Sequence, residues 1–572
     1  MKMHPNPQFA RPDYILLNGE WEFQYSDAAT YWQKDLSQKE RLKNRIQVPF
    51  PPEAKLSGIE DKDFHFCLWY AKEFTLPESF TTRHVLLHFG AVDYHTKVFV
   101  NATEVGEHFG GYSPFCFDIT PHLLEKNRIT VCVFDDSRDP RQPSGKQSPR
   151  YNSYSALYTR TSGIWQSVWL EACGETRVED IRFHTKLSGE VTADLAFNQS
   201  AVGCDATLEV SFNGTPIASL TDRITAFDHR LAFRIEAPQL WDVGEGNLYD
   251  CRLTLRKNGQ ILDTVLTYFG IREVGFANNA FTLNGKPLFL RTVLDQGFYR
   301  DGIYAAPSDE ALEKDIHLAM DMGFNGARLH EKVFDPRYLY HADRLGFLTF
   351  GEYPDMGLSI DKIEALSYML PEWLSVLKRD VNHPSIVCWC PFNETSTNDF
   401  FNGAFQDNRV IETVYHITKQ FDPSRPVFDT SGSMHSSVTD VYDVHDYTQD
   451  VEKFKTLFAK GIRPHMYGNV NGAYRGQPYM VTEFGGIRWE IDGDGTNAWG
   501  YGQAPSTEQE FLARFETMVS TLLQNPDCTG FCYTQLYDVE QEKNGLYTYD
   551  RVAKFDADHI KRIVSAAASI EK

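Results

Sequence analysis

The sequence predicts three domains, two β-sandwiches followed by a (β/α)8 barrel. Up to about residue 274, short alternating or aromatic runs are interrupted by Gly, Asn, Asp and Pro, a pattern typical of antiparallel sheets. From Phe276 onward, helical periodicity alternates with short apolar runs, as in parallel strands joined by helices. A chain of 572 residues with 42% hydrophobic side chains can fill several separate cores.

The two β domains are expected over residues 1–173 and 174–274. In the first, runs such as TRHVLLHFGAVD (82–93) and RITVCVFDDS (128–137) have strand-like patterns bounded by turn residues. In the second, Asn258-Gly259 is a hairpin signal between two such runs. The length of the second region fits one immunoglobulin-like sandwich.

The barrel is expected over residues 275–572. Amphipathic segments at 308–322, 335–346, 362–381 and 506–524 predict helices between its strands. The eight strand candidates are 288–294, 326–330, 348–352, 386–391, 427–429, 441–445, 479–483 and 530–535. The chemistry of such a barrel lies at the carboxyl ends of its strands.

Two carboxylates follow opposite strands of this predicted barrel. Glu394 comes just after the fourth strand in FNET, and Glu483 ends the seventh strand in TEFGG. Cleavage of a glycosidic bond needs one carboxyl group to protonate the leaving oxygen and another to attack the anomeric carbon or activate water. Each motif alone could be a turn with a helix cap, but the pair predicts a glycosidase. Asn393, directly before the acid, could hydrogen-bond a sugar hydroxyl.

Composition and motifs argue against several other classes of protein. The formal charge of −22 disfavours nucleic acid and anionic membrane surfaces as partners. Neither a dinucleotide fingerprint nor a phosphate-binding loop is present, so we expect no organic cofactor. Ten cysteines without metal-ligand spacing predict reduced thiols and no metal site. No apolar stretch reads as a signal peptide or membrane span, which favours the cytoplasm, although a processed secreted form would look the same.

The order of domains and several motifs resemble glycoside hydrolase family 2 over nearly the whole chain. The motifs are LNGEWEF, TSGIWQSVWLE, GFNGARLH, FNET, TEFGG and NGLYTYDR. The resemblance implies a jelly-roll sugar-binding first domain and a retaining mechanism, with Glu394 as acid/base and Glu483 as nucleophile about 5 Å apart. It also implies a raised pKa for unliganded Glu394, an ionised Glu483, and possible assembly as a homodimer or homotetramer.

The resemblance suggests roles for other residues at the barrel mouth. Arg328 would support the nucleophile, with an ordinary ion pair as the alternative. Tyr447 would donate to the nucleophile, whereas His445 or Asp446 could be the substrate ligands of that strand. His330 could contact substrate or be a core histidine.

Further candidates lie at the first and eighth strands. Asp295 and Gln296 could bind sugar hydroxyls, and Tyr533 and Tyr537 could form an aromatic platform or pack in the core.

Two departures from the family pattern narrow the expected substrate. The segment 351–357 (GEYPDMG) lacks the histidine of the galactosidase magnesium site, so we expect no catalytic magnesium. At 542–545 (EKNG), the Asn-x-Lys pair of glucuronidases is absent, and Glu542 would repel a uronate. Neutral β-galactosides are therefore the first expected substrates. Lys543 and Arg160 leave a β-glucuronidase or β-galacturonidase open, and an inactive carbohydrate-binding protein is the third reading.

Overall fold

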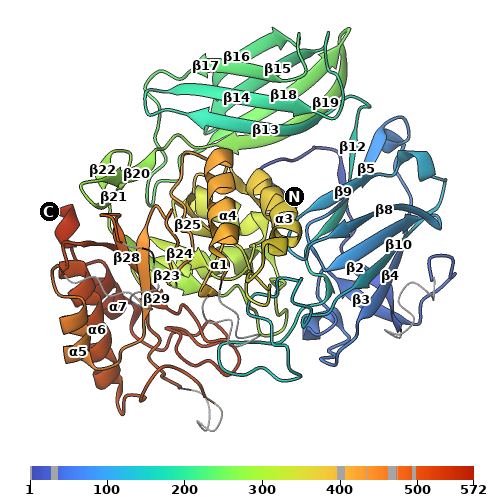
Figure 1. Cartoon of the computed structure of the whole chain (residues 1–572). Helices are drawn as coiled ribbons and strands as arrows, with labels where there is room; N and C mark the ends of the chain where they lie inside the picture. Colours follow the sequence, from blue (N-terminus) through green and yellow to red (C-terminus); the bar gives the residue numbers. More distant parts are fainter. Residues whose placement is uncertain are drawn as a thin grey trace.

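The computed structural model describes residues 3–26, 36–395, 406–432, 434–461, 472, 474–491 and 498–572. Two β-sandwiches lie against a barrel of parallel strands, one beside it and one above it in Figure 1. The predicted fold class is confirmed.

The first sandwich packs a four-stranded sheet, in the order β1-β12-β5-β9, against a six-stranded sheet, in the order β3-β2-β4-β10-β7-β8. Alternating Val, Leu and Ile side chains from both sheets fill the space between them. The strands are β1 (Tyr14–Leu16), β2 (Gly19–Ser26), β3 (Asn44–Val48), β4 (Cys67–Phe74), β5 (His84–Phe89), β6 (Val92–Asp93), β7 (His95–Val100), β8 (Thr103–Phe109), β9 (Phe115–Asp118), β10 (Asn127–Phe134), β11 (Gly163–Ile164) and β12 (Val168–Cys173).

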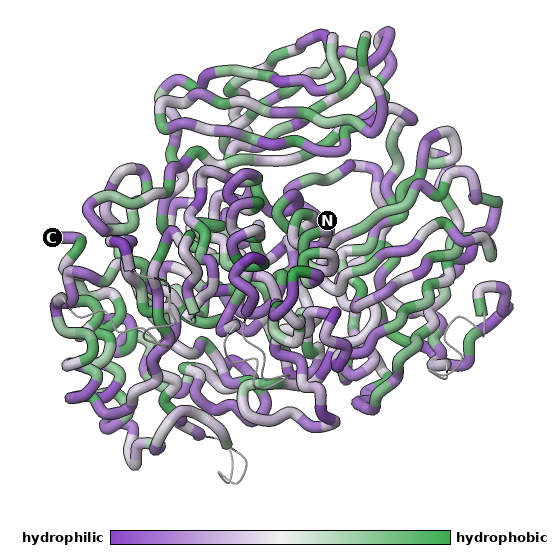
Figure 2. The backbone as a smooth tube through the Cα atoms, in the orientation of Figure 1, coloured by the Kyte–Doolittle hydropathy of each residue, from purple (hydrophilic) through white to green (hydrophobic). Residues whose placement is uncertain are grey.

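The second sandwich pairs the sheets β13-β14-β17 and β16-β15-β18-β19. Hydrophilic and hydrophobic residues alternate along its strands in Figure 2, because one face of each strand is buried and the other is exposed. The strands are β13 (Val178–Thr185), β14 (Glu190–Phe197), β15 (Asp205–Phe212), β16 (Thr215–Arg223), β17 (His229–Arg234), β18 (Tyr249–Lys257) and β19 (Gln260–Phe269). The predicted Asn258-Gly259 turn joins β18 to β19, and both residues have positive φ.

A small antiparallel sheet, β20 (Val274–Ala277), β21 (Ala280–Leu283) and β22 (Lys286–Pro287), leads into the barrel. The strands of the barrel run parallel in the order β26-β25-β24-β23-β29-β28-β27. They are β23 (Leu290–Asp295), β24 (Gly326–Leu329), β25 (Leu348–Glu352), β26 (Ile386–Cys390), β27 (Tyr442–Asp446), β28 (Tyr479–Gly485) and β29 (Cys528–Thr534).

The expected strand at 427–429 is not a continuous strand. Val427 makes an isolated parallel bridge to Trp389 of β26, and Ser431 makes one to Asn393, beyond the end of that strand. Side chains replace the missing ladder on the other side, since the amide of Val427 donates to the Asp440 carboxylate and that of Asp429 to the Thr439 hydroxyl. This segment still fills the fifth position of the barrel.

Helices surround the barrel, and several begin at a side-chain cap. Ser308, Asp335 and Thr507 accept hydrogen bonds from the first turns of α1, α2 and α6. The helices are α1 (Asp309–Asp321), α2 (Pro336–Leu345), α3 (Leu366–Asp380), α4 (Asn408–Phe421), α5 (Val451–Leu457), α6 (Glu508–Gln524) and α7 (Ala557–Val564). Among the described helices, none has both the length and the apolar character needed to cross a membrane.

The first domain is attached to the barrel by side chains that belong to both. Tyr112, Tyr158 and Trp165 are part of the same buried cluster as the barrel core. The long segment between β10 and β11 crosses to the barrel in Figure 1, where the amides of Ser144 and Gly145 donate to the Met356 carbonyl at 2.8 and 3.1 Å. The first domain therefore forms part of the wall around the barrel mouth.

Candidate active site

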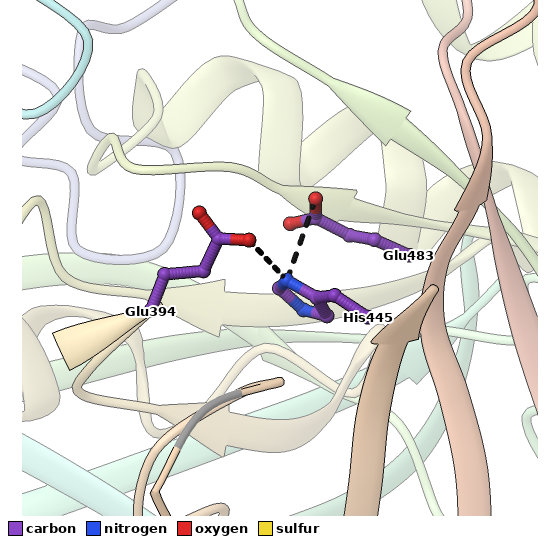
Figure 3. Close-up of side chains that lie close together, drawn as sticks. All are labelled: Glu394, His445 and Glu483. Atoms are coloured by element: carbon purple, nitrogen blue, oxygen red, sulfur yellow. Dashed lines mark hydrogen bonds and ion pairs between the residues drawn. The ribbon is translucent and has the colours of Figure 1, made fainter. Parts of the chain in front are cut away.

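Two carboxylates and an imidazole meet at the carboxyl end of the barrel. Nδ1 of His445, on β27, lies 2.7 Å from Oε1 of Glu394 and 3.5 Å from Oε2 of Glu483 (Figure 3). One carboxylate oxygen of each glutamate lies within 4.8 Å of the other. Because Nδ1 faces only carboxylate oxygens here, it carries a proton and donates it.

The backbone at Glu394 is strained. Its φ of +47° is in the left-handed region, which costs a residue with a side chain about 1–3 kcal/mol. Backbone hydrogen bonds hold this conformation, since the Glu394 amide donates to the Ser431 carbonyl at 3.0 Å and the Asn393 amide donates to the Asp355 carboxylate at 2.8 Å. Strain of this kind fixes the direction in which the carboxyl group projects.

The guanidinium of Arg328, at the end of β24, organises the floor of the site. It is fully buried and donates to Glu352 at 2.6 Å and to Glu483 at 3.1 Å. A third bond, 3.0 Å long, reaches Oδ1 of Asn393. Since an arginine can only donate, this contact fixes the amide orientation, and Nδ2 of Asn393 has no hydrogen-bond partner among the described ranges.

Tyr447 lies beyond the end of β27 and donates a short hydrogen bond to Oε2 of Glu483. Its ring is stacked on that of Tyr501, with the centroids 3.4 Å apart. Both oxygens of Glu483 therefore accept hydrogen bonds, one from a cation and one from a phenol.

The pKa values of the two glutamates are both lowered. Burial raises the pKa of Glu483, but the charges of His445, His330 and Arg328 outweigh that effect. For Glu394, burial is again opposed, and the hydrogen bond and charge of His445 lower its pKa to about 2. The expected ionised state of Glu483 is thus in agreement, whereas the expected raised pKa of unliganded Glu394 is wrong. The reason is His445, whose own pKa is raised, against the effect of burial, by Glu483 and Glu394.

A cavity of about 230 Å³ opens above these groups. Its lining includes Gln296 and His330 of the barrel and Lys146 of the first domain. The cavity is lined by Lys146, Ser155, Ala156, Leu157, Leu294, Gln296, His330, Met356, Glu394, Tyr447, Glu483, Trp499, Tyr501, Thr534 and Glu542. Side chains of two domains thus enclose the carboxylates.

Some residues singled out from the sequence meet in this cavity. Gln296 donates to Gln535 at 2.9 Å, and its own Oε1 has no hydrogen-bond partner in the described part of the chain. His330 is buried between Glu352 and Glu483, and burial lowers its pKa. Both therefore lie at the cavity, and contact with a sugar stays a prediction, with a core histidine as the alternative for His330.

Other expected residues do not line the cavity. Asp295 is fully buried and accepts from Tyr537, Tyr338 and the Gly297 amide. Tyr533 packs on Phe484 and Phe515.

The remaining polar candidates also lie outside the lining. Asp446 accepts from the Thr448 amide in a turn. Arg160 donates to the carbonyls of Arg150 and Lys62, and Lys543 is half-buried outside the cavity.

Sequence reasoning missed Lys146, Trp499 and Tyr501 as parts of the site. Trp499 and Tyr501 lie in the loop after β28 and supply the aromatic surface expected from strand eight. Lys146 lies in the first domain, more than 200 residues from either glutamate, and only domain docking brings it to the barrel. No local pattern in the sequence indicates either feature.

Three of the site residues could hold a metal ion by distance alone, namely Glu394, His445 and Glu483. The protonated Nδ1 of His445 donates to Glu394, so this nitrogen has no free lone pair for a metal. Glu483 accepts hydrogen bonds from Arg328 and Tyr447. A cation would have to compete with the buried charge of Arg328, so the set does not fit a resident metal.

A barrel with two facing carboxylates at its mouth, preceded by two β-sandwiches, is the architecture of a glycoside hydrolase. The chain belongs to glycosyl hydrolase family 2, because three models of that family match it in sequence. Residues 15–172 match the sugar binding domain, residues 176–272 match the model described as glycosyl hydrolases family 2, and residues 274–495 match the TIM barrel domain.

Similar proteins carry two kinds of name. A putative beta-glucuronidase of Formosa agariphila is 30% identical over 395 residues, which are 65% of this chain and 46% of that protein. A beta-galactosidase of Thermoanaerobacter pseudethanolicus is 27% identical over 453 residues, 75% of this chain and 55% of that protein. The chain thus spans about half the length of these curated relatives.

Among solved structures, the beta-glucuronidase of Bifidobacterium dentium is 20% identical, with a TM-score of 0.79. The match covers 97% of this chain and 98% of that structure. At this identity the likeness shows the fold.

Proposed function

We propose that this protein is a retaining, exo-acting β-glycosidase, with β-galactosides as its first substrates. The observation that carries the proposal is the pair Glu394 and Glu483, whose carboxylate oxygens approach within 4.8 Å around His445. Retaining enzymes need carboxyl groups about 5–5.5 Å apart, whereas inverting enzymes need about 6.5–9.5 Å to admit water.

Glu483 is the proposed nucleophile. Arg328 and Tyr447 hold its two oxygens, so the ionised carboxylate faces the anomeric carbon. Attack forms a bond between a Glu483 oxygen and that carbon while the bond to the leaving oxygen breaks. Water then hydrolyses the glycosyl-enzyme ester.

Glu394 is the proposed acid/base, and it shares its proton with His445. In the unliganded site the imidazole holds the proton and Glu394 is ionised. Transfer from Nδ1 of His445 to Oε1 of Glu394, across 2.7 Å, leaves a neutral imidazole and a protonated acid. Glu394 then passes this proton to the leaving oxygen, and in the second step it takes a proton from water.

A neutral sugar is the proposed glycone because Glu542 lines the cavity. Its carboxyl group is buried, and burial raises its pKa to about 7. A uronate placed against this group would raise its pKa further, so binding would require Glu542 to hold a proton, whereas a neutral sugar imposes no such requirement. Uronides are the second candidate, since curated relatives named beta-glucuronidase and beta-galactosidase both resemble the chain.

The test is hydrolysis of nitrophenyl β-galactoside, glucoside, mannoside, glucuronide and galacturonide by the intact chain and by Glu483→Gln. We expect turnover of the β-galactoside, loss of at least about 10³-fold in Glu483→Gln, and release of the β-anomer as first product by NMR. Glu508→Gln, at the exposed start of α6, is the matched control. Release of the α-anomer would contradict the retaining mechanism, and turnover of uronides alone would contradict the neutral glycone.

A further inference from the structure

Lys146 is a buried cation in the cavity that no step of the proposed mechanism uses. Its side chain comes from the first domain, and the residue is only 7% exposed. In the described part of the chain, no acceptor forms a hydrogen bond or ion pair with its ammonium group within 4.0 Å. The three N–H donors of this cavity-lining residue therefore have no partner among the described residues.

The backbone around Lys146 is fixed on both sides. Gly145 has a φ of +53° and packs so closely against the Glu331 carbonyl that a side chain would collide with it. The carbonyl of Lys146 accepts from the Tyr158 amide at 2.8 Å. Gln147 donates to Asp93 at 3.0 Å and to Tyr112 at 3.1 Å. The backbone that carries the Lys146 side chain is thus rigidly held beside the cavity.

The charge of Lys146 is balanced through space, although its hydrogen bonds are not satisfied. Its positive charge lowers the pKa values of Glu394 and Glu542, against the effect of burial on each. Glu394, Glu483 and Glu542 already bring three carboxyl groups to the cavity. A ligand carboxylate would add a fourth, whereas hydroxyl groups would satisfy the donors without adding charge.

Acceptors suited to the same ligand lie in the same cavity. Oε1 of Gln296 is buried and has no hydrogen-bond partner among the residues that the structure describes. Glu542 accepts from Tyr158 and Asn544 and has further lone pairs available. A set of donors and acceptors around a cavity of about 230 Å³ suits a polyhydroxyl ring.

We propose that Lys146 is a specificity-determining residue that donates hydrogen bonds to hydroxyl groups of a neutral terminal sugar. This inference rests on the proposed function and assigns part of glycone recognition to the first domain. The barrel supplies the acid and the nucleophile, and the first domain supplies a contact to the hydroxyl groups of the sugar.

The first experiment compares Lys146→Met with Arg141→Met, a cation in the same segment whose side chain is exposed and outside the cavity. Lys146→Met is expected to lower kcat/KM on the preferred neutral glycoside by roughly 10- to 100-fold, the loss of a charge-assisted hydrogen bond. Arg141→Met is expected to stay within about twofold of the intact chain. Melting temperatures of both variants show whether the fold is retained.

The second experiment uses 3-deoxy, 4-deoxy and 6-deoxy versions of that glycoside. The intact chain should be less active on the deoxy sugar that lacks the contacted hydroxyl than on the parent glycoside. Lys146→Met should be about as active on that deoxy sugar as on the parent glycoside. An equal Lys146→Met loss on the parent and on every deoxy sugar would overturn the proposal, because the residue would then act without touching the glycone.

Binding measurements separate this proposal from the proposed function. Titration calorimetry with free galactose, glucose, mannose and the two uronic acids needs no turnover. Weaker binding of a neutral sugar in Lys146→Met supports the proposal even if Glu483→Gln retains activity. Preferential binding of a uronic acid, lost in Lys146→Met, or binding of none of these sugars would overturn it.

Discussion

Arg328 connects the residues on which the proposed chemistry depends. Its donors reach Glu352, Glu483, Asn393 and the carbonyl of Thr482, all in a buried environment. One side chain therefore fixes both the charge of the nucleophile and the direction of an amide. A lysine has a single ammonium group and cannot hold these acceptors in the same plane.

Arg328→Lys is expected to lower kcat by at least about 100-fold, because the geometry of Glu483 and Asn393 is lost together. The positive charges near Glu483 lower its pKa, so weakening them raises that pKa. Since Glu483 acts in its ionised form, the acid limb of the pH–rate profile should move to higher pH. Stopped assays across pH 4–9 measure both effects, and an unmoved acid limb would contradict the role of Arg328.

His445→Asn tests the shared proton. In the intact chain the raised pKa of His445 keeps a proton in the site, and activity should fall as pH rises through the pKa of the pair. Without the imidazole, only the carboxyl group of Glu394 can hold the proton. A carboxyl group has a lower pKa than an imidazole, so the alkaline limb of the pH–rate profile should move to lower pH. Pre-steady-state assays should show slower formation of the glycosyl-enzyme. An alkaline limb that stays in place would exclude His445 as the proton store.

At the scale of elements, the strand ends were predictable and the loops were not. Apolar runs predict parallel strands, so the spacing of those runs predicted that Glu394, Glu483 and Arg328 lie at strand ends. The segment at 427–429 was predicted as a strand but forms only isolated bridges. Its amides donate to the side chains of Asp440 and Thr439, and the apolar pattern of the segment itself does not reveal these bonds.

Of the two alternatives for Tyr533, core packing is the one that strand geometry explains. Successive side chains of a strand face opposite sides, so Thr534 lines the cavity while Tyr533 points to α6. The aromatic surface comes instead from Trp499 and Tyr501, in a loop without periodicity. To predict Lys146 as a site residue would require the arrangement of the two docked domains, which no pattern in one sequence supplies.

Gly145→Ala tests the rigid support of the inserted segment. An added methyl group would collide with the Glu331 carbonyl, and alanine also disfavours the positive φ. We expect KM to rise about tenfold because the wall of the cavity shifts. Gly214→Ala, which has a φ of +75° and open space around it, is the matched control for the backbone term. Equal effects of the two changes on KM would contradict the docking role.

At the scale of the whole molecule, Arg11 fastens the two sandwiches together. It is buried and donates to Glu171 of β12 at 2.8 Å. It also donates to both oxygens of Asp263 on β19 at 3.0 Å and to the Val178 carbonyl at 2.7 Å. Its bonds thus join the end of the first domain to both sheets of the second.

Arg11→Met would leave the buried carboxylates of Glu171 and Asp263 with fewer partners. Breaking a buried charge pair from one side costs about 3–5 kcal/mol in the free energy of unfolding. Urea unfolding followed by circular dichroism should show an earlier first transition. The control is Arg45→Met, an exposed arginine whose ion pair with Glu20 spans 3.8 Å, for which we expect less than about 1 kcal/mol. Similar shifts in both variants would contradict the fastening role.

The segment between β10 and β11 separates the proposed choice of sugar from the proposed catalytic groups, and this separation affects how the protein can evolve. The groups proposed to break the bond lie on barrel strands, whereas the cation proposed to choose the sugar lies on a loop of another domain. Substitutions in that loop can alter the accepted sugar while leaving the proton transfers intact. Recombining first domains among relatives would therefore be a direct route to new substrate preferences.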